Sequence, residues 1–86
     1  MSKIIEKTSK SGENIKCEVF EEYGEPFGDG KWQYRLTQAS WGDREKRYDL
    51  RKWSPNMEQF SSGLRFTDSE LYDLLNAIEE ALGISE

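Results

Sequence analysis

The amino-acid sequence predicts an α+β fold, in which a four-stranded antiparallel sheet is followed by one C-terminal helix. Polar and apolar residues alternate with a period of two in several segments before residue 54, which is the pattern of half-buried strands. Residues 67–83 instead carry a helix-capping signal and apolar residues at helical spacing. A chain of 86 residues has room for one such domain.

The N-terminal part of the chain is expected to form a flexible lead-in and then the first strand. Residues 1–13 are polar and rich in lysine and serine, which indicates a mobile segment, so we place the domain at residues 14–86. Ile15, Cys17 and Val19 alternate with charged residues and predict the first strand. Residues 23–30 hold three glycines and a proline, and we interpret them as a loop.

Residues 32–41 and 45–53 predict the second and third strands, joined as a hairpin at residues 42–44. Alternation divides the second strand into one side with Trp32, Tyr34 and Leu36 and another with Gln33, Arg35, Thr37, Ala39 and Trp41. It divides the third strand into one side with Lys46, Tyr48, Leu50 and Lys52 and another with Arg47, Asp49, Arg51 and Trp53. Because Leu50 is expected to point to the core, the side that carries Arg51 and Trp53 is expected to be open.

A short fourth strand and the helix complete the predicted domain. Pro55 ends the third strand because proline cannot donate to the ladder, and residues 63–66 predict the fourth. Thr67 and Glu70 form a capping box at the start of the helix, and Gly83 ends it. The apolar stripe of the helix consists of Leu71, Leu74, Leu75, Ile78 and Leu82. This stripe is wider than one small sheet can cover, so we expect a two-fold interface between helices.

Positive charge is concentrated in the middle of an acidic chain. The formal net charge is −5, yet residues 31–53 hold seven basic and three acidic residues, a local net charge of +4. The same segment holds all three tryptophans. Basic side chains among indoles suit a surface that binds a polyanion whose bases are free to stack. The segment therefore favours binding of single-stranded nucleic acid.

The composition argues against several other classes of protein. The chain has no histidine, which removes the commonest general base and the commonest transition-metal ligand. Its single cysteine, Cys17, excludes an internal disulfide and a zinc knuckle. No apolar run is long enough for a signal peptide or a membrane span. We therefore expect no cofactor, no metal, no catalysis and no membrane, and a cytoplasmic, nucleoid-associated location.

The same residues resemble a known family. Residues 48–55 (YDLRKWSP), residues 63–67 (GLRFT) and the acidic-capped helix resemble the positive-cofactor-four family of transcriptional coactivators. The likeness is greater to its small bacterial branch, the YdbC-type proteins, which residues 40–43 (SWGD) also fit. It covers roughly residues 31–82.

The resemblance implies a function as well as a fold. It implies a homodimer of β-β-β-β-α subunits whose curved sheets form a groove for single-stranded DNA, with little sequence preference and no enzymatic activity. It implies that Arg51 meets phosphate, that a base stacks on Trp41, and that Lys46 contacts the backbone. The long regulatory tail of the eukaryotic members has no counterpart here, so the resemblance gives no support for a coactivator role through such a tail.

The charge block and the resemblance together give a set of candidate residues. The candidates for nucleic-acid binding are Trp32, Arg35, Trp41, Lys46, Arg47, Arg51, Lys52 and Trp53. Among the tryptophans, Trp32 is expected to be the most structural because it shares a side with Leu36. Two alternatives are a protein-interaction module without nucleic-acid contact and a metal-dependent nuclease that uses Asp43, Glu45 and Asp49. The pathway and the preference for DNA or RNA stay open.

Overall fold

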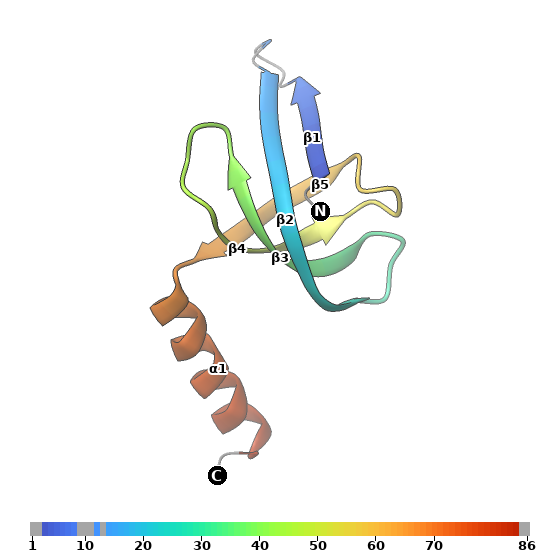
Figure 1. The fold of residues 1–86 in the computed structure, drawn as a ribbon. Coiled ribbons are helices and arrows are strands. Elements are labelled where there is room, and N and C mark those ends of the chain that lie inside the picture. Colours follow the sequence, from blue (N-terminus) through green and yellow to red (C-terminus); the bar gives the residue numbers. More distant parts are fainter. Residues whose placement is uncertain (1–2, 9–11, 13, 85–86) are drawn as a thin grey trace.

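The computed structural model describes residues 3–8, 12 and 14–84 and shows one antiparallel sheet followed by a helix (Figure 1). The elements are β1 (Lys3–Thr8), β2 (Asn14–Phe27), β3 (Gln33–Trp41), β4 (Arg47–Trp53), β5 (Phe60–Phe66) and α1 (Asp68–Leu82). The strands lie side by side in chain order. The predicted α+β class with one C-terminal helix is confirmed, whereas the predicted number of four strands is wrong.

The additional strand is β1, which falls where we expected a flexible lead-in. It pairs antiparallel with β2, and Ile5 lies opposite Cys17 in the register. Ile5 is buried, but its neighbour Ile4 is 53% exposed. Ile5 is the one buried residue among residues 3–6, whose burial the structure describes, so this edge strand shows little of the alternation that marks a strand in a sequence. The rest of the lead-in, residues 1–2, 9–11 and 13, lies outside the described residues.

Strand β2 is longer than predicted and includes residues 23–27 of the segment 23–30 that we interpreted as a loop. Its 14 residues run to Phe27. The register against β3 shifts twice, between Val19 and Glu21 and between Tyr23 and Phe27. Such bulges bend a strand and increase its twist, and Gly24 supplies a left-handed backbone with a φ of 72°. Figure 1 shows β2 bending along its length across the sheet.

The predicted hairpin of β3 and β4 is confirmed, with Leu36 opposite Leu50 and a turn at Gly42 in the left-handed region. Trp32 precedes β3 rather than starting it. Leu36 and Leu50 face α1, so the division of side chains between the two sides of the sheet is as predicted. The assignment of the core to the side of Leu50 is wrong. The buried apolar cluster lies on the other side and consists of Ile5, Cys17, Val19, Ala39 and Trp53.

Helix α1 begins and ends as predicted. The Thr67 side chain accepts a hydrogen bond from the Glu70 backbone N–H, and the Glu70 carboxylate accepts one from the Thr67 backbone N–H. These bonds lower the pKa of Glu70. Gly83 ends the helix with a φ of 70°. No residue of α1 is buried. The helix leads away from the end of β5, and its C-terminal end lies far from the sheet (Figure 1).

Position 63 on β5 requires a glycine, because the side chain of Arg51 on β4 fills the space opposite it. It pairs with Arg51 of β4, and a Cβ atom at this position would lie 2.5 Å from the Arg51 Cβ and 2.7 Å from the Leu50 carbonyl oxygen. Both are far inside van der Waals contact, and the second is a backbone atom that cannot move aside alone. The absence of a side chain at Gly63 therefore makes room for Arg51.

Replacing Gly63→Ala should lower the free energy of unfolding by about 1–3 kcal/mol, the usual cost of forcing extra volume into a packed site. The matched control is Gly30→Ala, because a Cβ there meets nothing closer than 3.8 Å. That control should change stability by less than about 0.5 kcal/mol. Urea denaturation followed by tryptophan fluorescence measures both, and equal stability of the two variants would contradict this packing argument.

Candidate functional site

A buried carboxylate organises the side of the sheet opposite α1. Asp49 has no exposed surface, and its two oxygens accept three hydrogen bonds. Arg51 donates from Nε to Oδ1 and from Nη2 to Oδ2, both at 2.6 Å. The Trp41 indole Nε1–H donates to Oδ2 at 3.0 Å. Residues 49 and 51 are two apart on β4, so both side chains point to the same side, and Trp41 reaches them from the end of β3.

Aromatic rings enclose the Arg51 guanidinium. Its Cζ atom lies 4.1 Å from the centre of the Trp41 ring and 5.8 Å from that of Phe60. The rings of Trp41 and Phe60 meet edge to face at 4.8 Å, and Trp53 stacks beside Trp41 at 6.3 Å. A guanidinium stacks well on an aromatic face because it is planar and weakly hydrated. The result is a packed cluster in which Trp41 keeps partial exposure.

Four of the five arginines of the chain lie on this side of the sheet, which we call the arginine face. Arg35 is directly opposite Arg51 in the register, and Arg65 is directly opposite Asp49. Arg47 lies opposite the buried Ala39. The arginine face thus takes side chains from three adjacent strands.

Each of these arginines already has an acceptor. Arg35 forms an ion pair with Glu22 at 2.7 Å, and Arg47 forms a longer one of 3.5 Å with the largely exposed Glu45. Arg65 donates to the Glu45 carbonyl oxygen at 2.8 Å. Ion pairs at a solvated surface contribute little free energy, so an incoming phosphate can compete for Arg35 and Arg47. The buried pair of Arg51 is of a different kind.

The structure separates the eight predicted site residues into four groups. Arg51 is 9% exposed and Trp53 is 1% exposed, so the prediction that they stand on an open face is wrong. Trp32, Arg35, Trp41 and Arg47 are partly exposed, and Trp53 rather than Trp32 is the most structural tryptophan. Lys46 is exposed, with its Nζ 4.8 Å from the Phe20 ring. Lys52 lies on the other side of the sheet, over Tyr34.

Sequence reasoning missed three residues of this site. The sequence points to Asp49 as a possible metal ligand or as a charge partner across the sheet, whereas its spacing of two from Arg51 on the same strand is the signal for the observed pair. Arg65 lay outside the basic segment. Phe60 preceded the predicted fourth strand, so no periodicity pointed to it. Both were brought to the arginine face by the pairing of β5 with β4.

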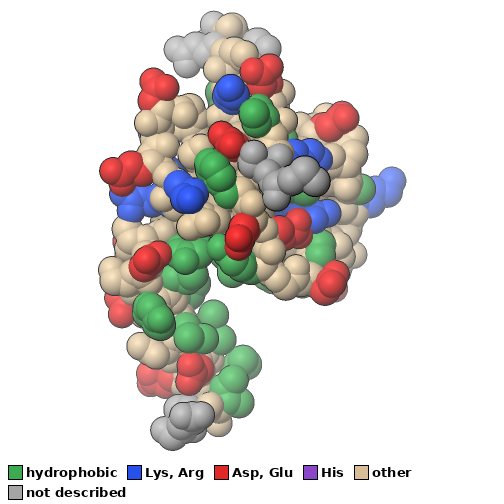
Figure 2. Space-filling view, viewed as in Figure 1, with side chains coloured by type: hydrophobic (Ala, Val, Ile, Leu, Met, Phe, Trp, Pro, Cys, Tyr) green, Lys and Arg blue, Asp and Glu red, His purple; other side chains and the backbone are tan. Residues whose placement is uncertain are grey.

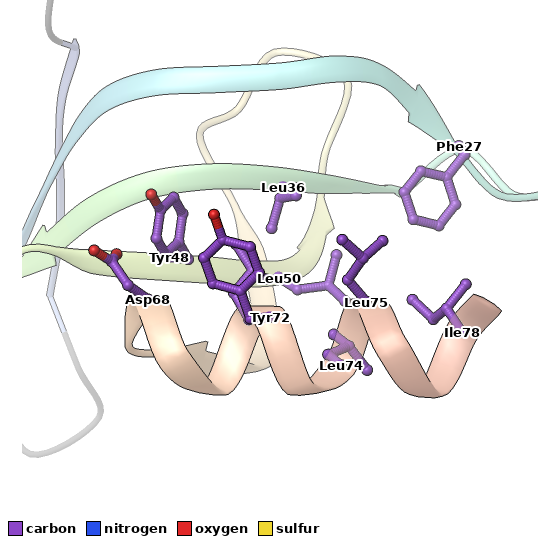
Figure 3. A pocket seen from close by; sticks show the side chains of 10 residues that line it. Phe27, Leu36, Tyr48, Leu50, Asp68, Tyr72, Leu74, Leu75 and Ile78 are labelled. Carbon is purple, nitrogen blue, oxygen red and sulfur yellow. The ribbon is translucent and has the colours of Figure 1, made fainter. Parts of the chain in front are cut away.

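The opposite side of the sheet forms an apolar cleft with α1. The cleft has a volume of about 550 Å³, and Figure 3 shows side chains of β3 and β4 facing those of the helix across it. Its lining includes Phe27, Leu36, Leu50, Leu74, Leu75 and Ile78. In the space-filling view, hydrophobic side chains gather where the sheet meets the helix and along the inner side of the helix (Figure 2). At its edge, the Asp68 carboxylate raises the pKa of Tyr48.

Other kinds of site find little support in the described part of the chain. No group of three or more cysteine, aspartate or glutamate side chains there is placed to hold a metal ion. Asp49, one of the three carboxylates considered for a nuclease, has its oxygens occupied by Arg51 and Trp41.

Within the residues that the structure describes, no helix combines the length and the apolar character needed to cross a lipid bilayer.

Comparison with known proteins gives a partial match to an uncharacterised protein of Treponema pallidum (strain Nichols). The two chains are 39% identical over 50 residues. The matched segment covers 55% of this chain and 59% of the Treponema protein. No family model matches the chain.

Cys17 lies in the buried cluster beneath the arginine face, so the reactivity of its thiol can be used to test how closely that cluster is packed. Its side chain is 1% exposed and lies opposite Trp41 in the register. Burial, helped by the negative charge of Asp49, raises the pKa of the Cys17 thiol from 9.0 to about 12. Because the folded pKa is the higher one, the resulting stabilisation is complete below about pH 9 and is lost as the pH rises toward 12.

Cys17 should therefore react with a disulfide reagent far more slowly in the folded protein than in the urea-unfolded chain, since the thiolate is the reactive form and the site is closed. Absorbance of the released thiol measures the rate at mildly alkaline pH. The rate should rise with urea below the unfolding transition. Equal rates in the folded and unfolded chains would show that the core beneath Trp41 is open.

Proposed function

We propose that this protein binds single-stranded nucleic acid, DNA in the first instance, on the arginine face of its sheet. The observation that carries the proposal is that the partly exposed Arg35 and Arg47 share one face of the sheet with the partly exposed Trp41. Arginine suits this task because its planar guanidinium both pairs with phosphate and stacks on rings. The proposed contacts are made without catalysis and without a cofactor.

We expect two kinds of contact on this face, ion pairs with phosphates and stacking on bases. Arg35 and Arg47 meet phosphates by exchanging their surface ion pairs, with Lys46 at the edge of the sheet. Trp41 stacks on a base, a contact that contributes about 1–3 kcal/mol and tolerates any base. Binding of this kind has little sequence preference, which agrees with the resemblance to the positive-cofactor-four family. In that setting the protein would act on melted or single-stranded DNA in transcription, repair or replication.

The net charge of −5 does not oppose this proposal. The basic segment is carried by β3, β4 and the turn between them, whereas acidic residues dominate α1. The Debye length is about 8 Å at physiological ionic strength, so charges along the extended helix are screened from the arginine face. They disfavour non-specific binding elsewhere on the molecule.

We also propose that two copies associate through α1 and the apolar cleft. Tyr72, Leu75, Ile78 and Leu82 are 69%, 48%, 43% and 68% exposed, and no residue of the helix is buried. Such a continuous apolar surface on a small domain indicates an interface. A second helix of the same sequence offers the matching apolar stripe. The two arginine faces would then remain free for one strand.

Titration with oligo-dT should quench tryptophan fluorescence, because a base stacks on Trp41. The logarithm of the affinity should fall with that of the salt concentration by about 0.7 per phosphate neutralised. Arg47→Gln should reduce this slope by about 0.7 and weaken binding. Lys52→Gln is the matched control, because it removes the same charge from the side of the sheet that faces α1.

Two results would contradict the nucleic-acid proposal. One is equal affinity for duplex and single-stranded DNA. The other is a loss of slope in Lys52→Gln as large as that in Arg47→Gln, which would show that the arginine face has no special role. Binding of an acidic peptide without any binding of oligo-dT would favour the protein-interaction module instead.

Leu75→Asp should convert the dimer to a monomer, because it places a charge in the middle of the apolar stripe. Light scattering coupled to size exclusion measures the mass. Asn76→Asp, which adds the same charge at the next, exposed position, should leave the dimer intact. A monomeric unaltered protein would remove the proposal of a homodimer.

A further inference from the structure

Trp41, Asp49 and Arg51 form one hydrogen-bonded unit, and the geometry points to Asp49 as the positioning residue of the proposed binding face. Asp49 orients the Trp41 ring for stacking on a base. Arg51 packs against the face of that ring and does not contact a phosphate. The inference rests on the proposed function, and it reverses the role that the family resemblance implies for Arg51.

The donors of Arg51 are largely committed inside the protein. Nε and Nη2 hold Asp49 at 2.6 Å, and Nη1 donates to the Ser61 carbonyl oxygen at 3.3 Å. The residue is 9% exposed and its partner carboxylate is fully buried. A bidentate ion pair of this kind has no net charge, and breaking it would leave an unpaired charge in the protein interior. Arg51 therefore offers no free positive charge to a phosphate.

The orientation of Trp41 depends on the same carboxylate. Its Nε1–H bond to Asp49 fixes the plane of the indole, and the guanidinium lies 4.1 Å from the ring centre. Trp41 is nevertheless partly exposed, so a base stacks on the part of the ring that Arg51 does not cover. A ring held in this way loses no rotational freedom on binding, which favours affinity.

Residues of β5 also help to hold Arg51 and Trp41 in these positions. Gly63 leaves the space that the Arg51 side chain fills, since a Cβ atom there would lie 2.8 Å from Arg51 Nε. Phe60 packs edge to face against Trp41 at 4.8 Å. Strands β3, β4 and β5 each contribute to the support of one partly exposed ring.

The first test replaces the ion pair with an apolar pair of similar size, Asp49→Leu with Arg51→Met, which leaves the net charge unchanged and removes the acceptor of the Trp41 N–H bond. The salt dependence of oligo-dT affinity separates the two possible roles of Arg51. If Arg51 only packs against Trp41, the slope should be unchanged and the affinity should fall about 5- to 150-fold, the range that corresponds to losing one base stack. A slope reduced by about 0.7, as expected for Arg47→Gln, would overturn the inference. Unchanged affinity would overturn it as well.

A second variant keeps the test decisive if the exchanged pair prevents folding. Trp41→Phe leaves the buried ion pair in place and keeps an aromatic ring, but it removes the N–H donor to Asp49. Binding should weaken several-fold without change of slope, and binding equal to that of the unaltered protein would overturn the inference. Failure of the unaltered protein to bind oligo-dT would instead refute the proposed function, so the two failures can be told apart.

Discussion

The burial of the Asp49 carboxylate is the constraint on which the sheet depends. A charged group without solvent is tolerated only when donors replace the lost water, and here Arg51 and Trp41 supply all three. Meeting that requirement fixes the end of β3 against β4, and it demands a glycine on β5. Removing one partner of such a pair typically costs about 3–5 kcal/mol. The cluster therefore sets the shape of the arginine face before any ligand arrives.

The two sides of the sheet have different chemistry and different proposed partners. One side combines arginines with a supported indole and suits a flexible polyanion with stacking bases. The other side is an apolar cleft between the sheet and a helix without buried residues, and it suits a second copy of the chain. This separation would let the proposed association and the proposed nucleic-acid binding occur together, because neither uses the surface of the other. The proposal is compatible with the net charge of −5, since the basic residues are concentrated in residues 31–53, which form β3, β4 and the turn between them.

Much of the fold could be predicted from the sequence, because hairpin turns, capping boxes and alternation are local signals. The hairpin at Gly42 and the helix Asp68–Leu82, capped by Thr67 and Gly83, are of this kind. Which side of the sheet forms the core could not be predicted, since Leu50 appeared to be the natural interior residue. Burial of Asp49 and Arg51 depends on pairing between side chains, which apolar patterns do not record. Strand β1 was missed because its pairing with β2, and not its composition, makes it a strand.

Nucleic acid is proposed to bind to the arginine face and not in the cleft. Side-chain NMR during titration with oligo-dT tests this proposal most directly, by following the Trp41 indole N–H, the Nε–H groups of Arg35 and Arg47, and the methyl groups of the helix stripe. We expect the indole and arginine signals to shift while the methyl signals of Leu75 and Ile78 stay in place. Shifts confined to those methyl groups, with the Trp41 signal unchanged, would contradict the proposal.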